Sequence, residues 1–366
     1  MTIISGNMQP KSDPSGPVKV LVVDDSAYMR YTITRHLEGR PEIMVAGTAR
    51  HGAEALELIP MLNPDVITLD VEMPHLDGIS TLREIMARFP RPVIMLSSLT
   101  GEGTVETIRA LTLGAVDFIT KPAQKANINE VMDDVVAKIL RASRARVSSI
   151  PIPLPASVPQ KNMEIKQSVR IRQKNEPIIV IGSSTGGPRA LNTLIPALPA
   201  DLPAAVVVVQ HMPAGFTRSL AERLNSLSGL KVKEAEPGDR LEVGKVLIAP
   251  GGFHMVLDAN EQFILNQNPP VHGVRPAVDV TLTSIVEHFG KHVIAAILTG
   301  MGNDGTNGAA LLHSIGGYVI AEHESSCIVY GMPRSVVEAG AADIVVPVND
   351  IALALDKRAR LQAYSS

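Results

Sequence analysis

The sequence predicts two α/β domains, each with a doubly wound parallel β-sheet whose faces are covered by helices. Short apolar runs alternate with segments that carry apolar residues at helical spacing, first over residues 18–142 and again over 177–360. Unbroken apolar strands are typical of parallel sheets that are buried on both faces. Residues 143–176 lose this alternation and become rich in Pro, Ser, Lys and Arg, which indicates a linker. Residues 1–17, rich in Gly, Pro and Ser, are expected to form a flexible arm.

Length and composition exclude several classes of protein. The 366 residues are 45% hydrophobic and 19% charged, which excludes wholesale disorder. The formal charge of −3 argues against a protein that mainly binds nucleic acid. The single cysteine, Cys327, forms no internal disulfide, which favours a reducing compartment. No apolar stretch approaches the ~20 residues of a membrane span, and the first residues lack signal-peptide features, so we expect a cytoplasmic protein without membrane insertion.

In the first domain, the segments 26–38 and 78–88 have the apolar spacing of helices. Five apolar runs are expected as strands: 18–23, 43–47, 65–69, 92–96 and 115–119. The carboxyl ends of parallel strands form one edge of a sheet, and ligands bind preferentially there. We therefore expect the functional residues of this domain at the carboxyl edge of its sheet.

Polar side chains follow four of these strands. Asp24 and Asp25 end the first strand and Asp70 the third, while Ser97 follows the fourth and Lys121 the fifth. Three carboxylates at one edge repel each other unless a cation binds, and oxygen ligands of this kind suit Mg²⁺. A hydroxyl and an ammonium at the same edge are suited to hold oxygens of a phosphoryl group on Asp70.

This constellation resembles the receiver domain of bacterial response regulators, over about residues 18–140. The resemblance implies a flavodoxin-like (βα)5 fold with Asp70 as the phosphoacceptor and a histidine kinase as the phosphodonor. It also implies that Mg²⁺ is held by Asp24, Asp25, Asp70 and the backbone carbonyl of Glu72.

The same resemblance gives three residues a sensing role. Ser97, Phe118 and Lys121 are implied to detect the phosphoryl group. Phe118 departs from the commonest pattern, in which a tyrosine changes rotamer. An apolar ring alters the chemistry of such a switch without excluding it.

The second domain carries the same alternation. Its expected strands are 177–182, 204–210, 245–250, 293–299 and 318–322. Its expected helices are 187–197, 216–227, 278–289 and 305–315. Receivers usually regulate another activity, so this domain is expected to hold the output.

The first strand of this domain runs into the turn G-S-S-T-G-G-P and then a helix. Gly182-x-Ser184-x-Gly186 matches a nucleophile elbow, where small flanking residues expose a serine on a tight turn. A phosphate-binding loop is the alternative, although the motif lacks the P-loop lysine and does not fit G-x-G-x-x-G. The loop alone leaves both interpretations open.

A nucleophilic serine requires a base, and His211 is the first candidate. It directly follows the strand 204–210, the next strand after the one that leads to Ser184. His254, after I-A-P-G-G-F, is the alternative base.

A carboxylate is expected to orient the base. Asp304 lies in a glycine-rich loop after the strand 293–299 and is the first candidate, although it is also suited to cap the following helix. Asp279, in R-P-A-V-D, is the alternative.

The motifs G-S-S-T-G-G-P, V-Q-H-M-P-A-G-F-T, L-T-G-M-G-N-D-G and S-S-C-I-V-Y-G-M-P-R resemble the catalytic domain of the chemotaxis protein-glutamate methylesterase (CheB) family, over about residues 177–350. The resemblance implies that Ser184 is the nucleophile, His211 the base and Asp304 the orienting acid. It implies hydrolysis of γ-glutamyl methyl esters, and deamidation of certain glutamines, on methyl-accepting chemoreceptors. For the oxyanion hole we expect the backbone N–H of Thr185 first and the Met301 loop second.

This chemistry needs no metal, so Mg²⁺ is expected only in the receiver. Two alternative functions remain. One is a response regulator whose second domain only binds DNA or another protein, although no helix-turn-helix signal is present. The other is a family member that acts on receptors outside chemotaxis.

Overall fold

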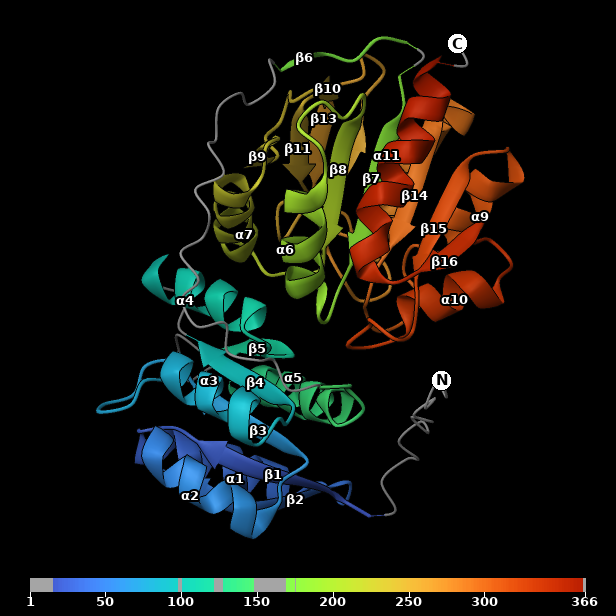
Figure 1. Cartoon of the computed structure of the whole chain (residues 1–366). Coiled ribbons are helices and arrows are strands. Elements are labelled where there is room, and N and C mark those ends of the chain that lie inside the picture. Colours follow the sequence, from blue (N-terminus) through green and yellow to red (C-terminus); the bar gives the residue numbers. More distant parts are fainter. Residues whose placement is uncertain (1–15, 98–100, 122–127, 148–168, 175, 365–366) are drawn as a thin grey trace, which may run out of the picture. The chain divides into compact units, whose positions relative to one another are not determined.

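Figure 1 shows the computed structural model, which describes residues 16–97, 101–121, 128–147, 169–174 and 176–364. The chain forms two compact units, each with its own central sheet. The predicted flexible arm, up to residue 15, and most of the predicted linker lie outside the described residues.

The first sheet has five strands in the order β2-β1-β3-β4-β5, which is the flavodoxin-like order. The strands are β1 (Val18–Val23), β2 (Ile43–Ala49), β3 (Val66–Asp70), β4 (Val93–Ser97) and β5 (Asp117–Thr120). The helices are α1 (Ala27–Glu38), α2 (Gly52–Leu62), α3 (Gly78–Arg88), α4 (Gly101–Thr112) and α5 (Ile128–Ala142). Strands β1 to β4 pair in parallel, as their unbroken apolar sequences predict. The (βα)5 prediction is therefore confirmed.

The second sheet has nine strands, and its long central strands are parallel. Seven of its strands are neighbours in the order β16-β15-β14-β7-β8-β10-β6. Off this path, β11 pairs with both β8 and β9. The bounds are β6 (Arg170–Ile171), β7 (Ile178–Ser183), β8 (Ala205–Gln210), β9 (Lys231–Glu234), β10 (Glu242–Val243), β11 (Lys245–Ile248), β14 (Val293–Ile297), β15 (Tyr318–Glu322) and β16 (Ile344–Val346). The short strand β10 pairs antiparallel with β8 on one side and with β6 on the other. Strand β6 lies within the predicted linker.

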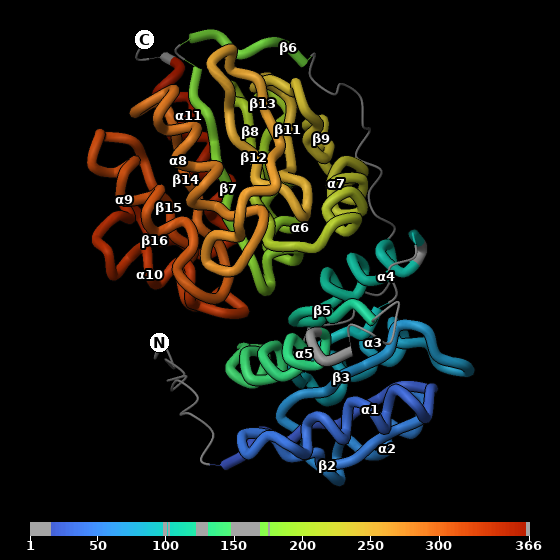
Figure 2. The backbone as a smooth tube through the Cα atoms, turned by 180° about the vertical axis from the view of Figure 1, so that it is seen from behind, coloured from blue at the N-terminus to red at the C-terminus, as the bar shows by residue number. Residues whose placement is uncertain are grey.

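Helices cover both faces of this sheet. Figures 1 and 2 show α6, α7 and α11 on one face, and α8, α9 and the hairpin of β12 with β13 on the other. The bounds are α6 (Gly187–Ala197), α7 (Phe216–Leu227), α8 (Val278–Phe289), α9 (Thr306–Ser314), α10 (Met332–Glu338), α11 (Val348–Tyr364), β12 (His254–Leu257), β13 (Phe263–Asn266) and a 3₁₀ turn at Gly290–His292. The helix predictions 187–197, 216–227 and 278–289 match α6, α7 and α8 residue for residue.

The core fixes which strand ends meet. Val180 on β7, Val207 on β8 and Ala295 on β14 are fully buried and pack with Leu282 of α8 in one apolar cluster. Because β14, β7 and β8 are neighbours and parallel, their carboxyl ends lie together at one edge. Among the described helices, none has the length and apolar character needed to cross a membrane.

Candidate active site

Ser184 lies directly after β7, on the turn that leads into α6. Its N–H donates to the carbonyl of Thr299 at 3.1 Å, and its own carbonyl accepts from the N–H of Gly187 at 2.8 Å. Gly186 adopts a left-handed conformation with φ of 81°, and a Cβ at this position would lie 2.8 Å from Cβ of Ile328. Glycine is therefore required here, and the elbow presents Ser184 at the edge of the sheet.

A buried amide connects the Ser184 turn to the neighbouring strand. Gln210, the last residue of β8, is 1% exposed, and its Oε1 accepts a hydrogen bond from Ser183 Oγ at 2.7 Å. Its Nε2 donates to the carbonyls of Ser184 and His211, both at 3.0 Å. A Cβ at Gly187 would come within 1.9 Å of Gln210 Oε1, so the start of α6 must be a glycine. The amide thus fixes the backbone on which both Ser184 and His211 stand.

His211 and Asp304 form a short ionic hydrogen bond, with 2.7 Å between His211 Nε2 and Asp304 Oδ2. Asp304 is 2% exposed and also accepts from the first N–H groups of α8, those of Val278 at 2.6 Å and Asp279 at 2.9 Å. Burial acts to raise the pKa of Asp304, but His211 and the two backbone N–H groups hold this pKa below its ordinary value. Asp304 is therefore a carboxylate that orients the ring of His211.

The geometry leaves the second ring nitrogen of His211 for the nucleophile. Ser183 pairs with Gln210 across β7 and β8, so Ser184 and His211 are the next residues along two adjacent parallel strands. Within the described part of the chain, neither Ser184 Oγ nor His211 Nδ1 has a hydrogen-bond partner. Nucleophile–base hydrogen bonds are often long in resting enzymes and shorten when substrate binds.

Two backbone N–H groups beside Ser184 are available for a further ligand. The N–H groups of Thr185 and Met301 have no acceptor among the residues that the structure describes, whereas the N–H of Ser184 is occupied by Thr299. The Met301 loop lies against Ser184, because a Cβ at Gly300 would be 2.8 Å from Cβ of Ser184. The arrangement suits an oxyanion.

The carboxyl edge of the first sheet holds the predicted cluster of carboxylates. Lys121 Nζ lies 2.7 Å from Asp70 Oδ2 and 3.0 Å from Asp24 Oδ2. Burial, together with the charge of Asp24, raises the pKa of Asp70 to about 6, although Lys121 acts to lower it. Carboxylate oxygens of Asp24, Asp25 and Asp70 lie within 4.8 Å of one another. This oxygen-rich set fits a divalent cation.

The other residues predicted for the receiver lie on or just after strands β3, β4 and β5. The N–H of Glu72 donates to Asp70 Oδ1 at 3.3 Å, and Phe118 lies on β5. Ser97, at the end of β4, is buried; its Oγ donates to the Gly103 carbonyl at 3.1 Å and accepts from Thr107 Oγ1 at 2.5 Å. The hydroxyl of Ser97 is therefore bonded to α4 in this conformation.

Comparison with known proteins decides the family. The model of the CheB methylesterase family matches residues 179–355, and that of the response regulator receiver domain matches 20–133. The protein-glutamate methylesterase/protein-glutamine glutaminase of Symbiobacterium thermophilum is 53% identical over 351 residues, 93% of this chain and 97% of the relative. This chain belongs to the CheB methylesterase family. It is an enzyme, a carboxylic ester hydrolase that carries a receiver domain.

Two further matches cover nearly the whole of the similar chain. The protein of the same name from Thermotoga maritima is 48% identical over 339 residues, which cover 91% of this chain and 96% of the relative. The crystal structure of the Thermotoga maritima CheB methylesterase catalytic domain has 53% sequence identity and a TM-score of 0.49, and the match covers 50% of this chain and 98% of that domain.

The structure separates the candidates that sequence reasoning left open. His254 is 1% exposed, and both of its ring nitrogens are bonded to backbone, Nε2 to the Pro269 carbonyl and Nδ1 to the Ala277 N–H. Asp279 contacts a different histidine, His272, at 2.9 Å. The N-cap of α9 is Gly305, so Asp304 does not cap that helix. His211 and Asp304, the first candidates from the sequence, are the histidine and carboxylate that contact each other beside the Ser184 turn.

A buried acid that the sequence did not predict lies close to the Ser184 turn. Glu322, the last residue of β15, is fully buried; it accepts from the Thr299 N–H at 2.7 Å and from Ser326 Oγ at 2.8 Å. Burial raises the pKa of Glu322. The carbonyl of Thr299 in turn holds the Ser184 N–H. A glutamate at the end of the apolar run Y-V-I-A-E was the available signal.

Proposed function

We propose that this enzyme hydrolyses γ-glutamyl methyl esters on the cytoplasmic helices of methyl-accepting chemoreceptors and deamidates receptor glutamines at the same site. The observation that carries the proposal is the 2.7 Å contact of His211 with buried Asp304, beside the Ser184 elbow. Two relatives that match over more than 95% of their own length are named protein-glutamate methylesterase/protein-glutamine glutaminase, which supports the choice of substrate.

In the acylation step, Ser184 Oγ attacks the carbonyl carbon of the ester while its proton passes to His211 Nδ1. Asp304 stabilises the imidazolium that results. The negative charge on the carbonyl oxygen is held by the N–H groups of Thr185 and Met301. The C–O bond to the methoxy group then breaks, and the leaving oxygen takes the proton from His211 and departs as methanol.

The second half of the reaction uses the same groups. Water gives a proton to His211 Nδ1 and attacks the acyl-enzyme, and the C–O bond to Ser184 breaks as Ser184 Oγ takes that proton back. The product is a glutamate side chain. In deamidation the leaving group is ammonia in place of methanol, so both substrates give the same product.

The receiver is proposed to regulate this activity through phosphorylation of Asp70 by a histidine kinase. Mg²⁺ would be held by Asp24, Asp25, Asp70 and the backbone carbonyl of Glu72. When bound, the cation neutralises negative charge on the phosphoryl oxygens and the surrounding carboxylates. The three carboxylates, whose oxygens lie within 4.8 Å of one another, support this assignment.

Three residues are proposed to report the phosphoryl group. Lys121, now bonded to Asp70, would pair with a phosphoryl oxygen, and Ser97 would exchange its bond to α4 for a bond to another oxygen. Phe118 would change its rotamer without the hydroxyl that a tyrosine brings. The enzyme would act in the cytoplasm, where the kinase and the receptor helices are, without binding nucleic acid or inserting into the membrane.

Release of radiolabelled methanol from receptor-bearing membranes, methylated with a tritiated methyl donor, tests the proposal. The full chain should release label, and acetyl phosphate with Mg²⁺ should accelerate the release. Ser184→Ala should lose about 10⁴-fold or more of the activity. Activity retained by Ser184→Ala would refute the assigned nucleophile, and no release by a wild-type chain phosphorylated at Asp70 would refute the substrate.

A further inference from the structure

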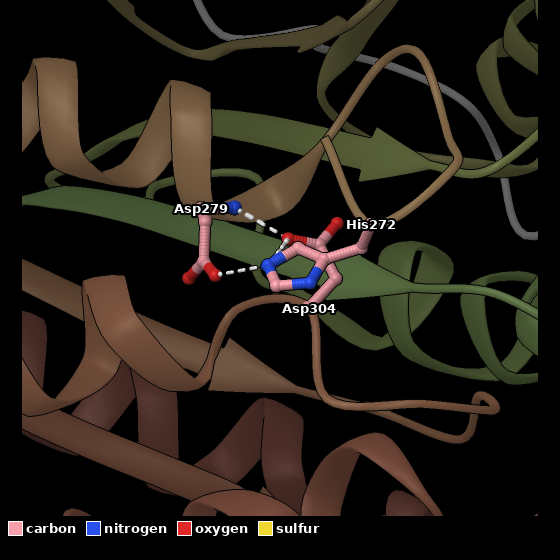
Figure 3. A group of neighbouring side chains, drawn as sticks. All are labelled: His272, Asp279 and Asp304. Carbon is pink, nitrogen blue, oxygen red and sulfur yellow. Dashed lines mark hydrogen bonds and ion pairs between the residues drawn. The ribbon is translucent and has the colours of Figure 1, made fainter. Parts of the chain in front are cut away.

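A second histidine–aspartate pair lies beside the proposed catalytic pair (Figure 3). His272 Nε2 is 2.9 Å from Asp279 Oδ2 and 4.0 Å from Asp304 Oδ1. Asp304 gives its other oxygen, Oδ2, to His211. The ring of His272 therefore faces two carboxylates, one of which orients the proposed base.

The two carboxylates are buried and close together. Asp279 and Asp304 are 6% and 2% exposed, and carboxylate oxygens of both lie within 4.8 Å of His272 Nε2 and of each other. Like charges at this separation in a buried site destabilise the ionised forms unless donors compensate them.

The donors are divided unequally between the two acids. Asp304 accepts hydrogen bonds from His211 and from two backbone N–H groups of α8. Asp279 accepts one backbone bond, from the Gly308 N–H at 2.8 Å, and one side-chain bond, from His272. Within the described ranges, His272 is the one side chain that compensates the charge of Asp279.

The backbone also places His272 at a constrained position. Val271 and Val274 exchange two backbone hydrogen bonds at 3.2 and 3.0 Å, which closes a tight turn, and His272 within it has φ of 55°. This left-handed conformation is uncommon for a residue with a side chain. It persists where surrounding contacts determine it, and the bond to Asp279 is such a contact.

We propose that His272 is a positioning residue of the hydrolase site, which compensates the charge of Asp279 so that Asp304 stays ionised and aligned with His211. The inference rests on the proposed Ser184–His211–Asp304 mechanism. Without His272, the uncompensated negative charge of Asp279 makes the His211–Asp304 pair bind a proton more tightly. As the pH falls, the pair then takes up its proton at a higher pH, and His211 stops acting as a base there.

Among the described residues, Glu287 lines the same pocket as Asp279 from further along α8. His211 comes from the end of β8. His254, on β12, and Arg275, in the loop before α8, are bonded to backbone groups, Arg275 to the carbonyls of Gln267 and Asn268. His272 and the two aspartates are therefore the groups whose charges the test must change.

The test compares His272→Leu with the wild-type full-length chain over a range of pH. Two readouts are kcat/KM for methanol release from methylated receptor membranes and the rate at which a fluorophosphonate labels Ser184. In the labelling reaction the Ser184 Oγ–P bond forms, fluoride leaves and His211 takes the proton. We expect the acidic limb of both profiles to move up by about one pH unit, a loss of about tenfold on that limb, with the alkaline plateau within about twofold. His272→Gln, which keeps a neutral N–H donor, should recover part of the shift.

A double-variant cycle identifies the cause. If charge compensation is the role of His272, the further change Asp279→Asn should return the acidic limb of His272→Leu to its wild-type position. His313→Leu, which removes a histidine paired with Asp343 from the last turn of α9, is the matched control and should leave the limb in place.

Two results would overturn the inference: an unshifted limb in His272→Leu, or a shift that persists unchanged in the double variant. Failure of the proposed function looks different. In that case wild-type and Ser184→Ala chains would behave alike in both assays.

Discussion

At the scale of single residues, Gln210 connects the backbones of Ser184 and His211, the proposed nucleophile and base. Replacing it with leucine removes one acceptor and two donors from a site that is 1% exposed. Ser183 Oγ and the Ser184 carbonyl then lose their buried partner. Leaving such groups unsatisfied costs about 1–3 kcal/mol in the free energy of unfolding. Because the backbones of Ser184 and His211 are no longer tied together, kcat should fall about 10- to 100-fold with KM nearly unchanged.

Steady-state methanol release and urea denaturation measure these two effects. Gln173→Leu, at an exposed glutamine before β7, is the matched control and should change neither quantity. A Gln210→Leu enzyme with a normal kcat would show that the amide stabilises the fold without positioning the site.

Ionisation of Asp70 lowers the free energy of unfolding of the receiver, so this stability depends on pH. The pKa of Asp70 is about 6 in the folded chain, against an ordinary value of 3.8 for an aspartate, so the folded state binds the extra proton between these pH values. The contribution of Asp70 to stability is therefore complete below pH 3.8 and is lost as the pH rises through about 6. Asp70→Asn, which never ionises, should stabilise the metal-free receiver by up to about 3 kcal/mol at pH 7 and by almost nothing at pH 4.

Hydrogen exchange of the amides of β1 and β3 reports opening of the receiver separately from the second domain. Wild type and variant are compared at each pH in a chelating buffer. Asp134→Asn, which removes the exposed carboxylate of an ion pair with Lys138, should give no comparable difference. Equal protection of wild type and Asp70→Asn at pH 7 would contradict the raised pKa.

At the scale of elements, the parallel strands and their ends could be predicted from sequence because each strand is a continuous apolar run. β7, β8 and β14 are fully buried, so no polar residue interrupts their pattern. Once the strands are predicted, their carboxyl ends are known, and Ser184, His211 and Asp304 become candidates because they lie in the segments after these ends. The short elements gave no such signal: β10 and β6 have two residues each, and the β12–β13 hairpin has four per strand.

Contacts between distant segments could not be predicted in the same way. Glu322 reaches Thr299 across neighbouring strand ends, and His272 reaches Asp304 through the turn before α8. Each pairing depends on how two loops fold over the sheet edge, which no local period encodes. Asp279 illustrates the limit: sequence placed it near the site, and only the fold shows that its partner is His272.

At the scale of the whole molecule, the two sheets carry different chemistry, so removing divalent metal should separate their contributions. The proposed Mg²⁺ ligands all belong to the carboxyl edge of the first sheet, whereas the proposed hydrolysis uses a serine, a histidine, an aspartate and backbone N–H groups of the second. A chelator should therefore return the acetyl phosphate-stimulated rate of methanol release to the unstimulated rate and lower it no further.

The variant Asp70→Asn distinguishes the effect of the chelator on the stimulated rate from its effect on the unstimulated rate. The variant cannot be phosphorylated at residue 70, so its rate should respond neither to acetyl phosphate nor to the chelator. If the chelator instead stopped the unstimulated reaction of Asp70→Asn, metal would be acting in the second domain. The carboxylates of Asp279 and Asp304 with His272 would then be the first residues to test, because they form the one candidate ligand set found among the described residues of that domain.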